Sequence, residues 1–290
     1  MEIIKASEKP ECFEKILNKL MVECNFLSPN WLPFNKKYNL NLFLERSYIE
    51  DISFIICKNN FPIIGFLGFI SNKDNIIDIP SCLLQTPEAN NKKVQSYFLK
   101  IFCEVVLHKK LFFTFRDYLR FGSMSFLSIY LLKLGANYET IFTHNINLNI
   151  DQSTLKQNLR KSYKSIVNNG LKENNIRIID KKDIVLDDIL AFRDLHIKES
   201  GRETRSKTSW IDQFEIVKQG EGFIVACYRD NKMISAGFFS ISKTFSIYQV
   251  SVSSSSESYK SPFHPLMWTA ILYSKKIGCD NLEVGDIIYN

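Results

Sequence analysis

The chain has 290 residues, of which 45% are hydrophobic, 13% aromatic and 23% charged, so it has ample apolar material for a folded core. Its formal net charge is +6, and Lys plus Arg outnumber Asp plus Glu by 17 to 14 in residues 1–150 and by 20 to 17 in residues 151–290. This mild, even charge disfavours a dedicated binder of duplex DNA, whose basic residues are usually concentrated, but it leaves anionic ligands open.

Cysteine and histidine usage predicts neither disulfide bonds nor a metal site. The seven cysteines are scattered and form no C-x-x-C pair, which favours free thiols in a reducing compartment, and the four histidines are equally dispersed. The start, "MEIIKASEKPECFEKIL", lacks the apolar stretch of a signal peptide, and the run "FPIIGFLGFI" is too short to cross a bilayer as a helix. We therefore expect a cytoplasmic protein that does not span the membrane.

The first half of the chain predicts helices and strands around an antiparallel hairpin. Two apolar runs, "ISFIIC" and "FPIIGFLGFI", are joined by the turn residues "KNN". The predicted elements are a helix over 11–23, strands over 52–57, 61–70 and 75–80, a helix over 93–109, a strand over 111–115, a helix over 124–135 and a strand over 138–148.

The second half repeats this pattern after a basic helix, "STLKQNLRKSYKSIVNNGLKE". A further hairpin forms where "GFIVACY" and "MISAGFFSIS" flank the turn "RDNK". The predicted elements are helices over 153–173, 187–200 and 208–220, strands over 176–180, 222–228, 233–242 and 245–252, a helix from Pro262 and a strand over 281–285.

The two hairpins share a design that predicts an internal duplication. In "FIICKNNFPIIGFLGFI" and "FIVACYRDNKMISAGFFSI" a polar turn separates two apolar strands, the second of which has a glycine before aromatic residues. Similarity between any two hairpins is the competing explanation, but a third strand, a helix and a short strand follow in both halves. We expect three-stranded antiparallel meanders over 52–80 and 222–252. The second copy lacks the closing helix and strand that residues 124–148 give the first.

The order of these elements resembles two acetyltransferase-like (GNAT) domains arranged as in the FemAB family. "LRKSYKSIVNNGLKENNIRIID" is similar to the stretch that opens the second FemAB domain, and "GFIVACYRDNKMISAGFFSI" to its central hairpin. "SPFHPLMWTAILYSKKIGCDNLEVGD" resembles its proline-led helix and the strand that ends in Gly-Asp. The resemblance implies an α/β (α+β) fold of two tandem GNAT-like domains with mixed sheets flanked by helices, over residues 1–150 and 151–290, and a functional cleft in the second.

The resemblance also implies an acyltransferase that moves an acyl or aminoacyl group onto an amine of a cell-envelope precursor, an amino sugar or a peptide. The donor is a coenzyme A thioester or an aminoacyl-tRNA, and no metal is required. The expected acceptor is an anionic small molecule or a lipid-linked precursor, and tRNA is a possible partner. Two alternatives stay open: a coenzyme A-dependent N-acetyltransferase with an atypical loop, and a non-catalytic binding module that has lost its activity.

Candidate catalytic residues flank the two strands that separate in a GNAT domain, here "FSIYQVSV" and "NLEVG". Tyr248 is a candidate general acid, while Glu283 and Asp286 are candidate bases for the amine proton. Strict alternation places Gln249 and Ser251 on one face of the first strand and Tyr248 on the other. A structural role for Tyr248 and solvated carboxylates at the strand ends are the competing explanations.

Candidate donor-binding residues are found in the first of these strands, in the serine-rich loop that follows it and at the start of the next helix. They are Gln249, Ser251, Ser253, Lys260 and His264. A typical acetyl-coenzyme A site offers glycine-rich backbone N–H groups to the pyrophosphate. This loop has no glycine, and Pro262 and Pro265 each remove one N–H donor, so the sequence predicts weak binding of coenzyme A.

Candidate acceptor-binding residues are cationic and come from two segments. Arg160 and Lys164 belong to the basic helix, and Arg202 and Arg205 to the loop "GRETRS". A cationic stripe beside an apolar seam suits an anionic acceptor, although a solvated helix face explains the same pattern equally well.

Overall fold

The computed structural model describes residues 1–24, 27–44, 48–71, 75–76, 83–113, 116–117, 124–256 and 261–287. By contacts, these residues form two units, one made of Met1–Ser28 and Leu42–Thr140 and the other of Pro29–Asn41 and Ile141–Asn290. The sequence-based division at residue 150 assigns Pro29–Asn41 and residues 141–150 to the N-terminal domain. In the structure, both segments group with the C-terminal unit.

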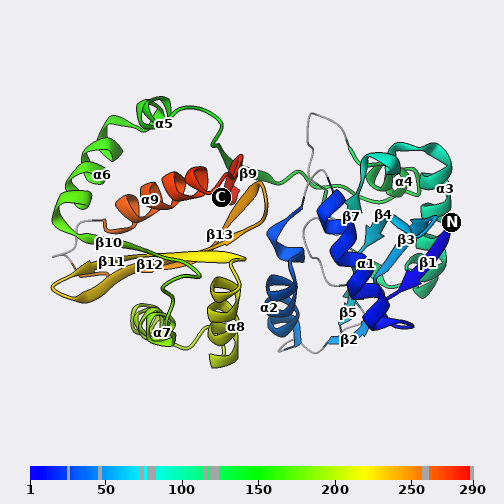
Figure 1. The fold of residues 1–290 in the computed structure, drawn as a ribbon, viewed down its shortest axis with the longest axis horizontal. Helices are drawn as coiled ribbons and strands as arrows, with labels where there is room; N and C mark the ends of the chain where they lie inside the picture. The colour runs from blue at the N-terminus through cyan, green and yellow to red at the C-terminus, as the bar shows by residue number, and fades with distance from the viewer. Residues whose placement is uncertain are drawn as a thin grey trace. The chain divides into compact units, whose positions relative to one another are not determined.

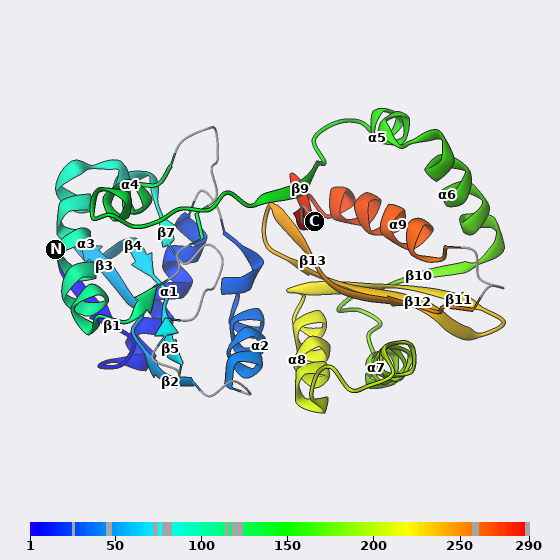
Figure 2. The ribbon, with the colours of Figure 1, turned by 180° about the vertical axis from the view of Figure 1, so that it is seen from behind.

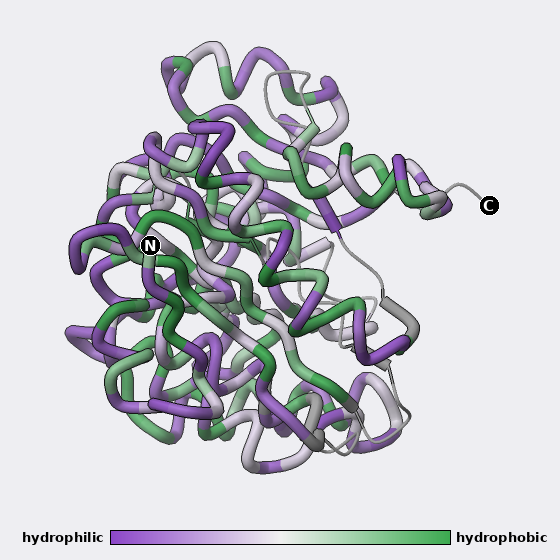
Figure 3. The backbone as a smooth tube through the Cα atoms, turned by 90° about the vertical axis from the view of Figure 1, so that its right-hand side faces the viewer, coloured by the Kyte–Doolittle hydropathy of each residue, from purple (hydrophilic) through white to green (hydrophobic). Residues whose placement is uncertain are grey.

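The described residues of the N-terminal unit form one antiparallel sheet, one mixed sheet and three α-helices, with Phe54, Phe66, Phe98 and Phe102 packed in the core. In Figure 3, which faces this unit, hydrophobic and hydrophilic stretches alternate along the backbone, as expected where each element buries one side. The strand order of the first sheet is β1 (Glu2–Lys5), β3 (Phe54–Lys58), β4 (Phe61–Phe66), β7 (Leu83–Gln85). The strand order of the second is β2 (Tyr48–Asp51), β5 (Phe69–Ser71), β6 (Asn75–Ile76), β8 (Phe112–Phe113). The helices are α1 (Pro10–Glu23), α3 (Lys92–Val105) and α4 (Phe126–Lys133).

The predicted meander over 52–80 is wrong in this unit. The run 61–70 divides into β4 and β5, which belong to different sheets, because the chain leaves the first sheet at Leu67 and Gly68. The neighbour of β4 is β7 rather than the run 75–80, of which residues 77–80 lie outside the described residues. The hairpin itself is confirmed, with Asn59 and Asn60 at positive φ in its two-residue turn.

The C-terminal unit is built on one six-stranded sheet. β11, β12 and β13 form the predicted antiparallel meander over 222–252, and Asp230 and Asn231 repeat the positive-φ turn of the first hairpin. The strand order is β10 (Asn175–Ile179), β11 (Gly222–Arg229), β12 (Lys232–Ile241), β13 (Phe245–Ser253), β14 (Asn281–Ile287), β9 (Phe142–Asn147).

Helices cover both faces of this sheet (Figures 1 and 2). One face packs against α6 and α9, and the other against α7 and α8. This double cover explains why the central strands β11 and β12 are almost continuously buried and largely apolar. The helices are α5 (Gln152–Asn158), α6 (Lys161–Glu173), α7 (Leu186–Ser200), α8 (Lys207–Lys218) and α9 (Phe263–Lys276).

Strand β9 corrects the expectation that the second copy lacks a closing strand. Residues 142–147 pair antiparallel with β14 and form the edge of the C-terminal sheet. The sequence prediction assigned this strand to the first copy because the hydrophobic pattern of a strand does not identify its partner. The strand that closes the C-terminal sheet therefore precedes the predicted second domain, residues 151–290, in the sequence.

The single basic helix predicted over 153–173 is two helices. α5 ends at Asn158, and Leu159 and Arg160 have extended backbone before α6 begins at Lys161. No proline or glycine marks this break. Its cause is tertiary packing, because the side chain of Leu159 packs on the hydrophobic core while α6 turns to lie against α9.

Close contact between α6 and α9 depends on Gly170. A Cβ atom placed on this buried helical glycine would lie 2.6 Å from Cγ of Pro265. Proline is a rigid ring and cannot withdraw as a flexible side chain would. The glycine that costs helix stability in α6 therefore permits the packing of the two helices.

A segment from the first half, α2 (Pro33–Leu44) and the preceding turn Pro29–Trp31, is anchored to the C-terminal sheet by the partly buried carboxylate of Glu221. Oε2 of Glu221 accepts hydrogen bonds from the backbone N–H groups of Phe34 and Asn35, both at 3.0 Å, and from Nδ2 of Asn35 at 3.2 Å. Oδ1 of Asn35 accepts a 2.6 Å bond from the hydroxyl of Ser240. The carboxylate thus satisfies N–H groups at the start of a helix, where its charge is also favourable. Burial nevertheless raises the pKa of Glu221, against the opposing effect of the hydrogen bonds from Asn35 and Phe34.

We predict that the Glu221 anchor makes stability depend on pH. The raised pKa means that the folded state binds the Glu221 proton more tightly than the unfolded chain does. Stability of the wild type should therefore fall, relative to the Glu221→Gln variant, as pH rises from the ordinary carboxyl pKa through the raised value. Thermal unfolding of both proteins between about pH 4 and pH 8 measures this difference. Parallel curves for the two proteins would contradict the prediction.

A second prediction concerns Gly170. Replacing a helical glycine by alanine normally stabilises a helix by up to about 1 kcal/mol, but here overpacking against Pro265 costs about 1–3 kcal/mol. Gly170→Ala should therefore lower the free energy of unfolding, as measured by denaturant titration. The matched control is Asn169→Ala at the exposed neighbouring position, which should be neutral or slightly stabilising. Equal stabilisation by both substitutions would mean that Pro265 moves to make room for the added methyl group, and it would contradict the prediction.

Candidate functional site

The candidate site is a fork between β13 and β14. The two strands pair in parallel at Phe245 with Asn281, Ser246 with Leu282 and Ile247 with Glu283. β13 then continues to Ser253, while β14 continues beside β9. Successive residues of a strand direct their N–H and C=O groups to opposite neighbours, so alternate N–H groups of β13 beyond Ile247 face the side that β14 has left.

A β-bulge at Gln249 lies at the opening of this fork. Phe239 of β12 pairs with Tyr248, and Phe238 pairs with Val250, so Gln249 is the extra residue. The bulge reverses the predicted alternation: Tyr248 and Ser251 share a face, and their hydroxyls form a 2.5 Å hydrogen bond. Gln249 instead donates a 3.4 Å bond to Oδ1 of Asn30. The sequence prediction failed because it assumed a strict period of two.

Tyr248 and Ser251 face α9. The ring of Tyr248 lies 5.7 Å from that of Phe239 and 6.1 Å from that of Phe263, measured between centroids. Ser251 stands opposite Gly237, where a Cβ atom would lie 3.1 Å from Leu266 of α9. Further along β13, the hydroxyl of Ser253 is 2.7 Å from that of Ser235. A row of hydroxyl groups therefore lines this face of β13, beside the start of α9.

The start of α9 carries a chain of aromatic contacts that extends to α6. The ring of His264 lies 4.8 Å from that of Tyr163, and the guanidinium of Arg160 lies 6.0 Å from the Tyr163 ring centre. Phe263 connects His264 to Tyr248, with centroid separations of 6.4 Å and 6.1 Å. Nδ1 of His264 is buried and has no hydrogen-bond partner among the described residues. The structure thus brings together Arg160 and His264, which the sequence prediction assigned to different substrates.

The two carboxylates predicted as bases lie at different points of β14. Glu283 belongs to the last pair before the strands separate and is 7% exposed. Its neighbour Leu282 packs in the core on the α9 face, so alternation directs Glu283 to the opposite face. Asp286 is exposed and pairs with Thr143 of β9, beyond an irregularity in β14 at which Gly285 has φ of +112°.

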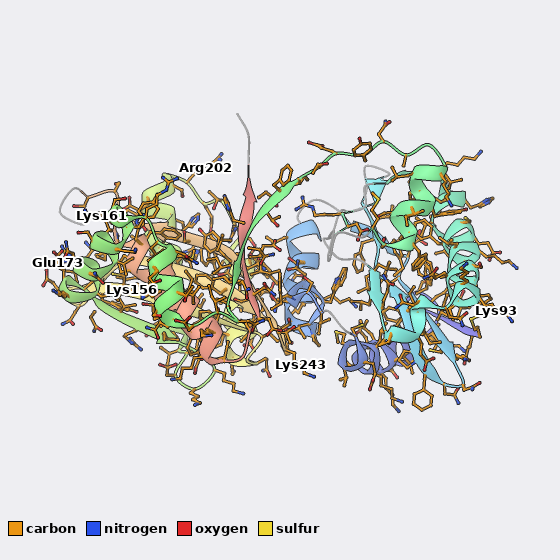
Figure 4. All side chains as sticks on the ribbon, turned by 90° about the horizontal axis from the view of Figure 1, so that it is seen from above. Lys93, Lys156, Lys161, Glu173, Arg202 and Lys243 are labelled. Carbon is orange, nitrogen blue, oxygen red and sulfur yellow. The ribbon has the colours of Figure 1, made fainter. Side chains whose placement is uncertain are left out.

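The four predicted acceptor-binding cations are divided between the two faces of the sheet. Arg160 and Lys164 lie at α6, where Nζ of Lys164 donates a 2.9 Å bond to the carbonyl oxygen of Gln157. Arg202 and Arg205 lie in the loop between α7 and α8, on the other face (Figure 1). In Figure 4, which is seen from above, Arg202 is labelled at a different point of the C-terminal unit from Lys156 on α5 and Lys161 on α6.

Arg205 lies in a tightly held loop. Its Nη1 is buried without a hydrogen-bond partner among the described residues. Nearby, burial and the charge of Arg205 both lower the pKa of His196, whose ring packs against Trp210. Arg193 holds the loop through an ion pair with Glu203 of 2.7 Å.

The serine-rich loop after β13 is described as far as Ser256, and the predicted donor ligand Lys260 lies outside the described residues. The backbone N–H of Ser255 donates to Glu199 at 2.8 Å, and hydrogen bonds from Ser255 lower the pKa of that carboxyl. A pocket of about 380 Å³ adjoins this loop on the α7 side and is lined by residues that include Lys198, Lys232 and Ser254. The start of the loop is therefore held at α7 rather than folded around the N-terminus of α9.

Within the described part of the chain, no cluster of three His, Cys, Asp or Glu side chains has the geometry to hold a metal ion. Nor does any helix described there have the length and apolar character needed to cross a membrane. The thiols of Cys57, Cys227 and Cys279 are free and buried, and burial raises the pKa of each, to about 11, 11 and 12 respectively.

Sequence reasoning missed Tyr163 and Phe263 as members of the site. The helical spacing of Tyr163 from Leu155 and Leu159 assigns it to the apolar seam beside the cationic stripe, yet it is 39% exposed and contacts two charged or polar side chains. The available signal was an aromatic residue three positions after Arg160 in an otherwise basic segment. Phe263 is the first residue of α9, directly after Pro262, and offered no comparable signal.

Comparison with known proteins extends these observations to the whole chain. No protein-family model matches the sequence, and no curated protein matches it. Among solved structures, FemX shares the fold with a TM-score of 0.72 at 10% identity, over 100% of this chain and 90% of FemX.

Two further structures are similar over almost the whole chain. One is L-PGS from Bacillus licheniformis, with a TM-score of 0.60 at 10% identity over 95% of this chain and 76% of that one. The other is a tandem GNAT protein from the clavulanic acid biosynthesis pathway, with a TM-score of 0.51 at 9% identity over 97% and 88%. The separation of β13 from β14, the duplicated hairpins and these likenesses together give the chain a FemAB-like, tandem GNAT fold.

Proposed function

We propose that the chain is an acyltransferase that moves an acyl or aminoacyl group onto an amine of a cell-envelope precursor, an amino sugar or a peptide. The observation that carries this proposal is the fork, which has Tyr248 on one face of the sheet and Glu283 on the other. The functional cleft of the proposed enzyme then lies in the C-terminal unit.

The similar structures support this choice of chemistry. FemX, L-PGS and the C-terminal domain of a putative lysylphosphatidylglycerol synthetase from Agrobacterium fabrum all share the fold at about 10% identity. The last of these names describes a product made of an amino acid and a membrane lipid. A donor that carries an aminoacyl group is therefore favoured over acetyl-coenzyme A, in keeping with the loop that lacks glycine.

The reaction at the fork is a nucleophilic substitution at a carbonyl carbon. The neutral amine attacks this carbon, a C–N bond forms, and negative charge develops on the carbonyl oxygen. Beyond Ile247 no described strand pairs with this edge of β13, so a backbone N–H there is suitably placed to donate to this oxyanion. The C–O bond of an aminoacyl ester, or the C–S bond of a thioester, then breaks and releases the carrier.

The two proton transfers of the reaction take place on opposite faces of the fork. The Glu283 carboxylate accepts the proton that the amine loses, and the Tyr248 hydroxyl gives a proton to the departing oxygen or sulfur. Exchange with solvent then restores both groups. The amine accordingly approaches from the face that α7 and α8 cover, and the donor from the face of α9. Asp286 assists as a second carboxylate near the amine.

This division of roles predicts unequal effects of two conservative substitutions. Glu283→Gln removes the base without changing the size of the side chain, and we expect kcat to fall by about 10²-fold. Tyr248→Phe removes one hydroxyl, and we expect a fall of about tenfold, since water can protonate the leaving group. The measurement is transfer of a radiolabelled aminoacyl group from charged tRNA, or of acetyl from acetyl-coenzyme A, to amino sugars, muropeptide precursors and lipid vesicles.

The matched control is Glu173→Gln, which changes an exposed carboxylate at the far end of α6. It should retain wild-type transfer. Full activity of both Glu283→Gln and Tyr248→Phe would contradict the assigned roles. Absence of transfer by the wild type with every donor and acceptor would instead favour a non-catalytic binding module.

A further inference from the structure

The pocket of about 380 Å³ beside α7 has no role in the reaction proposed at the fork. Its walls come from α7, from the beginning of β12 and from the first residues after β13, and we name it the α7 pocket. We propose that it binds a carboxylate carried on a short aliphatic body, either a free amino acid or the carboxyl end of a peptide. The site itself goes beyond the proposed function, and only the peptide source rests on that function.

The floor of the α7 pocket is apolar. Leu195 of α7 and Met233 and Ile234 of β12 are the most buried lining residues, at 8%, 8% and 1% exposure. Methionine adapts its shape to different aliphatic groups. Because about 380 Å³ lies near the lower end of the usual range for ligand pockets, the ligand that fits is small.

The rim of the α7 pocket carries an excess of positive charge. Lys198 of α7 and Lys232 of β12 are exposed, and neither forms an ion pair with another described residue. The one acidic lining residue, Asp194, is already paired with Arg193 at 3.2 Å. A lysine ammonium group forms charge-assisted hydrogen bonds with a carboxylate, so two such groups above an apolar floor match an aliphatic carboxylate.

The loop wall of the α7 pocket is held in place by hydrogen bonds. The backbone N–H of Ser254, a lining residue, donates to the carbonyl oxygen of Ile234 at 2.8 Å. The carboxylate of Glu199 on α7 accepts a 2.8 Å bond from the backbone N–H of Ser255, and hydroxyl groups of the same loop also lower the pKa of this carboxyl. A wall that is already ordered lowers the entropic cost of binding a ligand.

The α7 pocket lies on the face of the sheet from which the amine approaches in the proposed reaction, the face that α7 and α8 cover (Figures 1 and 2). Ser254 follows Ser251 by three residues, so the pocket is about 10 Å further along the chain than the fork. A peptide whose carboxyl end lies about three residues from its reacting amine can therefore reach both places. A free amino acid would occupy the pocket alone.

Ligand-observed NMR tests the proposal with two carboxylates, L-leucine and trialanine, and with their amides, leucinamide and trialanine amide, which lack the anionic group. We expect the wild type to bind at least one of the carboxylates, and to bind the matching amide about tenfold more weakly or less, because charge-assisted hydrogen bonds are lost. Binding of leucine alone identifies a free amino acid as the ligand, and binding of trialanine identifies the end of a peptide.

Variants of the lining residues assign the binding to the α7 pocket. Lys198→Gln and Lys232→Gln each remove one ammonium group from the rim and should weaken binding of the carboxylate by about tenfold. Ala191→Phe, at an exposed lining position, should abolish binding by filling the pocket while both lysines remain. The matched control is Lys172→Gln, an exposed lysine of α6 on the other face of the sheet, which should bind as the wild type does.

The proposal is overturned if neither carboxylate binds, if the amides bind as tightly as the carboxylates, or if Ala191→Phe and both rim variants bind as the control does. These outcomes are distinct from failure of the proposed function. Binding at the α7 pocket without acyl transfer to any acceptor would support the pocket and refute the transferase. Acyl transfer by a protein that binds neither carboxylate would refute the pocket alone.

Discussion

The site depends on one constraint in the backbone, the separation of β13 from β14 after three residue pairs. A strand in the middle of a sheet normally has both rows of N–H and C=O groups paired, and buried groups without partners are costly. Here the bulge at Gln249 and the irregularity before Asp286 redirect the two strands on either side of the separation. The backbone groups between them can then serve a ligand, and the side chains of Tyr248 and Glu283 reach the same opening from opposite faces.

Packing on both faces keeps the fork in a fixed geometry. On one face α9 approaches closely because Gly170 and Gly237 leave room for Pro265 and Leu266. Its far end is tied down where the hydroxyl of Tyr273 donates to Asp180 at 2.7 Å, a bond that lowers the pKa of the aspartate. On the other face the anchor between Glu221 and Asn35 fixes a segment from the first half of the chain. The C-terminal unit is thus completed by two segments, Pro29–Asn41 and β9, that precede it in sequence.

Local signals predicted much of the fold. The turn residues at 59–60 and 230–231 identified both hairpins, and the helix beginning after Pro262 was found from its proline and apolar spacing. Long-range pairing was not predictable, because the pattern of β9 fits the edge of either sheet. The face of Tyr248 was predicted wrongly because a bulge adds one residue without a distinctive sequence. The convergence of Arg160 and His264 depends on the break at Leu159, which packing rather than propensity determines.

The two faces of the sheet present different side chains to the two substrates of the proposed reaction. Aromatic rings and hydroxyl groups line the α9 face, from Tyr163 to Ser251. On the other face Arg205, whose Nη1 is buried without a described partner, lies beside His196, whose pKa is lowered. A fixed positive charge in such a setting suits the anionic part of an acceptor, while Glu283 is placed for its amine. In the proposed reaction, cations on both faces of the fork would hold two anionic substrates without bringing their charges together, since the sheet lies between them.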